Sequence, residues 1–190
     1  ENCNAHVEGN EIKNGEKSVI ARNYTRAKII DNLIDSNVEG IQSTEQSNTE
    51  ILKNSILNID KFGILIQDES ITYIAENIIK NNGAGIKFDN NSKFKAEKNQ
   101  ITDNMYGILA TANSEGEITE NIIKDNNKDP MGWNVAVREN AKVEFDDYKE
   151  PQKPGEPVDY SISENKFTVS IPSNANKISF ENVLRQTKAG

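Results

Sequence analysis

An asparagine recurs at a nearly fixed interval along most of this chain, and this recurrence limits what the chain can fold into. The steps between successive copies are 22, 22, 23, 22 and 22 residues. The copies are Asn10, Asn32, Asn54, Asn77, Asn99 and Asn121. A fixed period of this size is the signature of a solenoid, in which each repeat buries its apolar side by stacking on the next.

Two further markers keep the same period. A Gly-Ile pair recurs at Gly40-Ile41, Gly63-Ile64, Gly85-Ile86 and Gly107-Ile108. From Asn32 onward, a small hydroxyl residue precedes each asparagine by seven positions, at Thr25, Ser47, Ser70, Ser92 and Ser114. Because no Leu-x-x-Leu-x-Leu run accompanies them, the period does not indicate a leucine-rich repeat.

Within a repeat, short runs of apolar residues alternate between two sides. Between Ser70 and Asn77, Thr72 and Ile74 fall on one side, and Ile71 and Tyr73 fall on the other. Alternation with period two predicts a strand. The same reasoning applies after the asparagine and at the Gly-Ile pair, so we expect three short strands and three turns per repeat. Stacked strands then place like residues in columns about 4.8 Å apart.

The repeated asparagine has two physical uses at a turn. Asparagine tolerates the left-handed backbone that a one-residue bend needs. Its amide can also bond to the asparagines of the neighbouring repeats, which predicts a structural ladder along the six asparagines. A second corner row follows the same turn chemistry and comprises Asn37, Asp60, Asn82 and Asn104.

This combination of asparagine, Gly-Ile and serine markers resembles the right-handed parallel β-helix family, the pectate-lyase-like superfold with generic β-helix repeats. The resemblance is close over residues 3–145 and looser beyond them. It implies an all-β, right-handed single-stranded parallel β-helix with about 22 residues per coil. We expect one domain over residues 1–184 with irregular loops at 125–133 and 146–160, returning to the repeat pattern at Tyr160 and Phe167, and then a tail at 185–190.

The first residues already lie within a repeat, since Cys3 aligns with Thr25 and Val7 with Ile29. Solenoid ends need caps. We therefore expect the sequence to be the C-terminal part of a longer β-helix. The same alignment identifies Cys3 as a small corner residue rather than a nucleophile, and His6 has no partners at metal-ligand spacing.

Composition excludes some partners. The net charge of −8 disfavours nucleic acid, because phosphate would be repelled. The chain has no run of eighteen apolar residues, so we expect no membrane insertion. The outward residues before the corner asparagines alternate in sign, which predicts an ion ladder that fixes register rather than a charged binding face. They are Asp31, Lys53, Glu76, Lys98 and Glu120.

The resemblance implies that enzymes of this fold act on polysaccharides laid across the outer face of the Gly-Ile strand. Candidate catalytic residues on or beside that face are Lys87, Asp89, Asp68 and Arg138. A calcium-dependent lyase would need clustered carboxylates and a basic residue, and a hydrolase would need two carboxylates at a defined separation. The set is thin for either, so we expect no metal and no cofactor, with calcium only under the lyase interpretation.

The two irregular loops are the other candidate sites, because solenoids place binding residues on insertions. Trp133, Asp129, Arg138 and Tyr148 would offer aromatic stacking and hydrogen bonds to a sugar. The alternative interpretation is that Trp133 covers an exposed edge of the core.

We therefore expect a non-catalytic β-helix scaffold or carbohydrate-contacting module of a secreted, periplasmic or cell-surface protein. The rival hypothesis is a lyase, hydrolase or epimerase that acts on acidic polysaccharide. Its site would lie on the Gly-Ile face or in further coils. The sequence leaves the glycan and the oligomeric state open.

Overall fold

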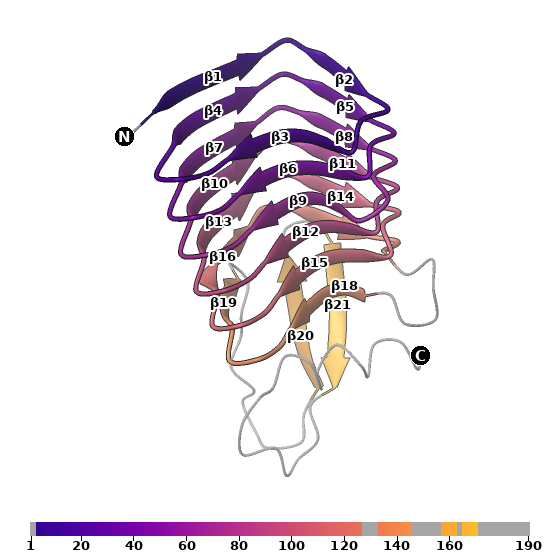
Figure 1. Ribbon diagram of the computed structural model, residues 1–190. Coiled ribbons are helices and arrows are strands. Elements are labelled where there is room, and N and C mark those ends of the chain that lie inside the picture. Colours follow the sequence, from indigo (N-terminus) through magenta and orange to yellow (C-terminus); the bar gives the residue numbers. More distant parts are fainter. Residues whose placement is uncertain (1–2, 127–132, 146–156, 163–164, 171–190) are drawn as a thin grey trace.

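The computed structural model is a stack of coils whose strands form three parallel sheets (Figure 1). It describes residues 3–126, 133–145, 157–162 and 165–170. In each coil a strand of sheet A is followed by one of sheet B and one of sheet C. The described residues contain no helix, and thus no helix that could span a membrane.

The strands are short and regular. Sheet A contains β1 (Asn4–Glu8), β4 (Arg26–Ile30), β7 (Asn48–Leu52), β10 (Ile71–Ala75), β13 (Lys93–Glu97), β16 (Glu115–Thr119) and β19 (Lys142–Phe145). Sheet B contains β2 (Glu11–Lys13), β5 (Leu33–Asp35), β8 (Ser55–Leu57), β11 (Ile78–Lys80), β14 (Gln100–Thr102) and β17 (Ile122–Lys124). Sheet C contains β3 (Lys17–Ala21), β6 (Glu39–Ser43), β9 (Phe62–Ile66), β12 (Ala84–Phe88), β15 (Tyr106–Ala110) and β18 (Trp133–Val137).

The register of the sheets confirms that equivalent residues lie over one another. In sheet A, Ile74 pairs with Ile51 on one side and with Ala96 on the other. In sheet C, Ile86 pairs with Ile64 and Ile108. These isoleucines are fully buried, so the interior is a set of continuous apolar columns. The predicted solenoid with three strands per coil is therefore confirmed.

The strands on either side of one turn between sheets C and A depart from the isoleucine pattern by burying two aromatic rings. Phe88 of β12 and Phe94 of β13 stack with ring centroids 3.5 Å apart and an interplanar angle of 8°. The equivalent positions of the next coil hold small residues, Ala110 and Gly116. A Cβ atom on Gly116 would lie 2.6 Å from the Phe94 ring, so the small residue makes room for the large one.

The turn between sheets A and B, hereafter the A–B corner, holds the predicted asparagine ladder. Asn77 Nδ2 donates to Asn99 Oδ1 at 2.9 Å and to the carbonyl oxygens of Ile51 and Ala75. Its own Oδ1 accepts bonds from the backbone and side-chain nitrogens of Asn54. The prediction that the asparagine itself is left-handed is wrong. The left-handed residue precedes it, as at Lys53 (φ 56) and Glu76 (φ 58), which leaves the asparagine free to point inward.

A second ladder lies at the turn between sheets B and C. Asn82 donates to Asn104, which donates in turn to Asn126 at 2.8 Å. The prediction that Asp60 belongs to this row is wrong, because the repeat from Asn54 to Asn77 has one extra residue. Ile59 occupies the ladder position instead, is 1% exposed, and donates only its backbone N–H to Asn82 Oδ1. Its side chain has no acceptor to offer in return.

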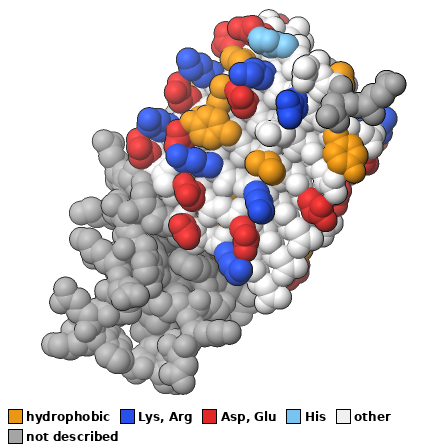
Figure 2. Space-filling view, turned by 90° about the vertical axis from the view of Figure 1, so that its left-hand side faces the viewer, with side chains coloured by type: hydrophobic (Ala, Val, Ile, Leu, Met, Phe, Trp, Pro, Cys, Tyr) orange, Lys and Arg blue, Asp and Glu red, His pale blue; other side chains and the backbone are white. Residues whose placement is uncertain are grey.

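The outer face of sheet A carries basic and acidic side chains in alternation (Figure 2). Lys28 pairs with Glu50 at 3.0 Å, and Lys142 pairs with Glu115 at 2.8 Å. The predicted ion ladder at the A–B corner is present in part, as Lys53–Glu76 at 3.8 Å and Lys98–Glu120 at 3.7 Å. These pairs are exposed to solvent, which screens their attraction, so they align neighbouring coils more than they stabilise the fold.

The C-terminal part of the chain differs from expectation. Strands β20 (Pro157–Ile162) and β21 (Asn165–Ser170) pair with each other antiparallel, with Tyr160 opposite Phe167. This segment therefore forms a hairpin and not the parallel coil predicted there. The predicted final coil around residues 178–184 and the tail at 185–190 lie outside the described residues.

Candidate functional site

Each coil returns from sheet C to sheet A through two consecutive residues with left-handed backbone, hereafter the C–A corner. At Asp68 and Glu69, for example, φ is 54° and 60°. The pairs are Asn23-Tyr24, Glu45-Gln46, Asp68-Glu69, Asn90-Asn91, Ala112-Asn113 and Glu139-Asn140. After the second pair, Ser47 turns inward and donates its hydroxyl to the Thr44 carbonyl at 2.8 Å, which holds the turn closed.

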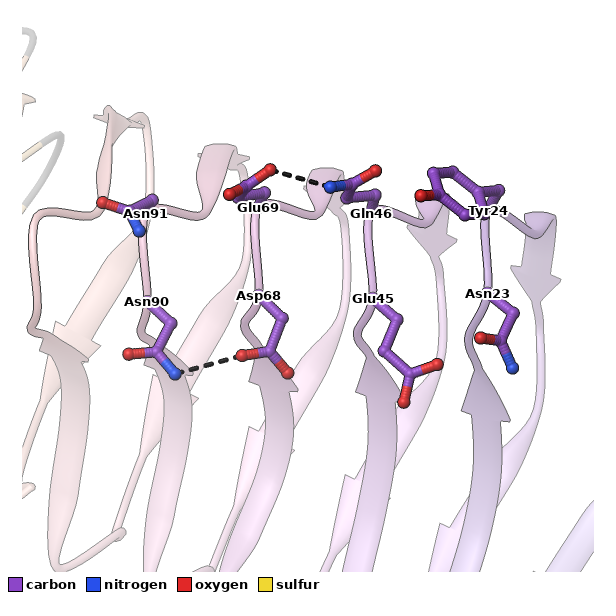
Figure 3. Close-up of a pocket in the computed structure, with 8 residues that line it drawn as sticks. All are labelled: Asn23, Tyr24, Glu45, Gln46, Asp68, Glu69, Asn90 and Asn91. Atoms are coloured by element: carbon purple, nitrogen blue, oxygen red, sulfur yellow. Dashed lines mark hydrogen bonds between the residues drawn. The ribbon is translucent and has the colours of Figure 1, made fainter.

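Side chains of four successive C–A corners line a shallow groove of about 520 Å³, hereafter the C–A groove. They form two rows along the solenoid axis (Figure 3). The first row is Asn23, Glu45, Asp68 and Asn90, and the second is Tyr24, Gln46, Glu69 and Asn91. The groove is therefore rich in amides and carboxylates, with one aromatic side chain at its N-terminal end.

Hydrogen bonds between coils fix the middle of the C–A groove. Asn90 donates to Asp68 Oδ1 at 3.0 Å, and Gln46 donates to Glu69 Oε2 at 2.9 Å (Figure 3). Thr44 and Gln67 donate to the other Asp68 oxygen at 2.6 and 2.8 Å. The bond from Thr44 is the largest influence on the pKa of Asp68. With the bonds from Asn90 and Gln67 it outweighs burial and lowers that pKa below its ordinary value.

Tyr24 is an unusual residue for its position. It is 56% exposed and has φ 60°, a backbone conformation that bulky side chains rarely adopt. The equivalent positions in the following coils are Gln46, Glu69 and Asn91, which are all polar. The ring is therefore held outward at some conformational cost, without contributing to the core.

The arrangement of coils agrees with the comparison against known families. A family model described as a right-handed β-helix region matches residues 1–127 and, in a second match, residues 73–147. The chain belongs to the right-handed β-helix family. No curated protein and no solved structure matches it.

The candidate catalytic residues of this β-helix lie on sheet C and its following turn. Lys87 projects outward from β12 and forms an ion pair with Asp89 at 2.6 Å. Asp68 lies in the C–A groove. Arg138 follows β18 and occupies the position equivalent to Asp89, since its N–H and that of Thr111 continue the same row of bonds. Register therefore brings the predicted residues to one side of the β-helix.

The electrostatics of these groups bear on what they could do chemically. Burial pushes the pKa of Asp89 upward. The Lys87 and Thr111 hydrogen bonds and the Lys87 charge outweigh this effect and leave that pKa below its ordinary value. Because the pKa of Asp68 is lowered too, both candidate carboxylates are ionised at neutral pH. Neither then has the raised pKa that a glycosidase's general acid requires.

The structure describes only some of the predicted loop residues. Asp129 and Tyr148 lie outside the described residues. Trp133 begins β18 and pairs with Tyr106 of β15, so its backbone belongs to sheet C rather than to a loop. The proposed roles of these residues in binding remain predictions.

Sequence reasoning missed two features of the outer surface. Tyr24 lies outside both the irregular loops and the Gly-Ile face, in a column that is otherwise polar. The residue before each glycine of the Gly-Ile pair also forms an outward column on sheet C, with Phe62 and Tyr106 two coils apart. Lys87 Nζ lies 5.6 Å from the centre of the Phe62 ring. Reading every outward column by register would have found both.

The described residues contain no group of three or more side chains suited to a metal ion. His6 contacts Glu8 at 2.9 Å on exposed surface, and Cys3 is exposed.

Proposed function

We propose that this protein is a non-catalytic β-helix scaffold that holds an extended polysaccharide along the C–A groove. The observation that carries the proposal is Tyr24, an exposed aromatic ring kept in a strained left-handed position at one end of a groove of amide side chains. The turn itself imposes the left-handed backbone in every coil, so what supports a functional role is the choice of a bulky aromatic residue at this position. We further propose that the protein acts outside the cytoplasm, where such polysaccharides occur.

The repeat of the groove suits a ligand that is itself a repeating chain. Successive coils present equivalent side chains about 4.8 Å apart along the axis. Asparagine and glutamine side chains each offer both donors and acceptors, which complement the hydroxyl groups of sugars. A tyrosine ring can pack against the apolar face of a sugar ring while its hydroxyl stays in water.

A purely binding role fits the state of the carboxylates. Asp68 already accepts bonds from Thr44, Gln67 and Asn90, and Asp89 is paired with Lys87. Groups tied into such networks hold a surface in shape, whereas a general base must be open to its substrate. The rival enzyme would instead need turnover that depends on Lys87 and Asp89.

A glycan array followed by titration calorimetry tests the proposal. We expect binding to one or more extended glycans, and an affinity for Tyr24→Ala that is about two- to twelvefold weaker, since an aromatic contact is worth about 0.5–1.5 kcal/mol. Tyr106→Ala on sheet C is the matched control and should bind like the wild type. An array without binding would refute the proposal, and loss on Tyr106→Ala alone would move the site to sheet C.

A further inference from the structure

The side chains that line the C–A groove carry charge of only one sign. Three of the eight are carboxylates, Glu45, Asp68 and Glu69, and none is basic. The three lie in the two middle coils of the groove (Figure 3). A ligand that follows the groove must therefore pass all three.

Basic residues lie near the groove only at its ends. Arg22 and Arg26 stand on either side of the Asn23-Tyr24 turn in the sequence, and Lys93 follows Asn91 by two positions. Lys87, on the adjoining face of sheet C, is neutralised by Asp89 at 2.6 Å. The middle of the groove therefore has no basic side chain among its lining residues to balance its carboxylates.

The central carboxylate is also fixed in place. Asp68 receives donors on both oxygens, from Thr44 and Gln67 on one and from Asn90 on the other. A carboxylate held by several donors stays ionised and cannot readily turn away from an approaching group. An anionic sugar at this point would meet a like charge in a fixed position.

We propose that the C–A groove selects uncharged polysaccharides over those containing uronic acids, and that Glu45, Asp68 and Glu69 are the specificity-determining residues. This inference rests on the proposed polysaccharide function of the same groove. It makes acidic polysaccharide the disfavoured class, because carboxylates on the ligand would be opposed by carboxylates on the protein.

The test compares two ligands with the same sugar chain, one with ionised carboxylates and the other with those carboxylates capped as neutral methyl esters. We would use galacturonate oligosaccharides and the same oligosaccharides after methyl esterification, with calorimetry at low salt and in the presence of a chelator. We expect the ester to bind about fivefold or more tightly than the acid, and added salt to narrow the gap. The double variant Glu45→Gln/Glu69→Gln should also reduce the difference in affinity between ester and acid. The single variant Asp68→Asn should reduce that difference more. Glu16→Gln, on the opposite side of the coil, should leave it unchanged.

The outcomes separate this inference from the proposed function. Equal binding of ester and acid by the wild type, or tighter binding of the acid, would overturn the selectivity and leave polysaccharide binding intact. If neither ligand binds but neutral glycans on the array do, a matched neutral and carboxylated pair built on the glycan that binds decides the point in the same way. If no glycan binds at all, the proposed function itself has failed. The Glu45→Gln/Glu69→Gln variant guards against misfolding of Asp68→Asn, because neither glutamate donates or accepts a bond in the Asp68 network.

Discussion

The A–B corner and the C–A corner both turn the chain from one sheet to the next, but their side chains point in opposite directions. Those of the A–B asparagines point into the core, and those of the C–A pairs point to solvent. Both rely on left-handed residues, one per coil at the A–B corner and two at the C–A corner. At the A–B corner the next residue is always asparagine, buried and bonded to its neighbours from Asn32 to Asn121. At the C–A corner the left-handed residues point to solvent and vary from coil to coil. Uniform inward side chains build the fold, which leaves the outward ones free to acquire function.

Removing one ladder amide should give the largest effect on stability. Asn77→Ala would leave the buried Asn54 N–H without its acceptor and would remove the amide that donates to the carbonyl oxygens of Ile51 and Ala75 and to Asn99 Oδ1. We expect a loss of about 3 kcal/mol or more in the free energy of unfolding, measured by urea denaturation. Asn91→Ala at the C–A corner is the control and should cost about 1 kcal/mol at most, since the next C–A corner already holds an alanine, Ala112, in its first left-handed position. Equal losses would erase the distinction between the corners.

Completing the second ladder is a sharper test of what a corner amide contributes. Ile59→Asn gives up the burial of an isoleucine but supplies an acceptor for the Asn37 N–H and a donor for Asn82 Oδ1. These terms nearly cancel, at about 1.5–3 kcal/mol for burial against about 1 kcal/mol per hydrogen bond. We expect a change within about 1 kcal/mol. Ile56→Asn, equally buried but inside β8, should cost about 3 kcal/mol or more. Similar losses at the two sites would mean that position 59 is ordinary core.

The same coil marks the limit of what sequence could predict. Periodicity located the strands, the isoleucine columns and the first asparagine ladder, because each depends on residues that recur at equivalent positions. It misplaced Asp60 because counting back from Gly63 ignores where in the coil the extra residue is inserted. The strand pairing of Leu57 with Asp35 and Lys80 shows that the extra residue follows the corner and fixes Ile59 as the corner residue.

The candidate site was harder to predict than the fold for a related reason. Asp68 and Lys87 were found because they lie on or beside a face that the family resemblance emphasised. Tyr24 and the groove were missed because their signal is a departure from the repeat, a tyrosine where the other coils have polar residues. Its exposure and its positive φ follow from three-dimensional packing and have no counterpart in a periodic pattern.

Exchanging residues at the second C–A position should separate stability from binding. Tyr24→Asn places a residue that tolerates the left-handed conformation, so we expect the free energy of unfolding to rise by about 0.5–1 kcal/mol. The same change should weaken polysaccharide binding as Tyr24→Ala does. The reciprocal Asn91→Tyr should lower stability by a similar amount. If Tyr24→Asn instead destabilised the protein, the ring would be part of the fold and the binding proposal would lose its main support.

Lowering the pH should change the free energy of unfolding through the C–A corner and not through the A–B corner, and this is the smallest of the predicted effects. The pKa of folded Asp68 is lowered from 3.8, so above that pH the ionised form contributes stability. That contribution is lost as the pH falls through the lowered pKa, because the unfolded chain takes up the proton more readily.

Other carboxylates titrate in the same range, so the informative quantity is the difference between wild type and Asp68→Asn. Urea midpoints measured from pH 6 down to pH 2 should show a smaller loss for the variant, by less than about 1 kcal/mol. Parallel curves would show that the bonds from Thr44, Gln67 and Asn90 do not stabilise the charge, and the fixed carboxylate on which the groove's selectivity depends would be in doubt. The ladder amides do not titrate, so the A–B corner adds nothing to this difference.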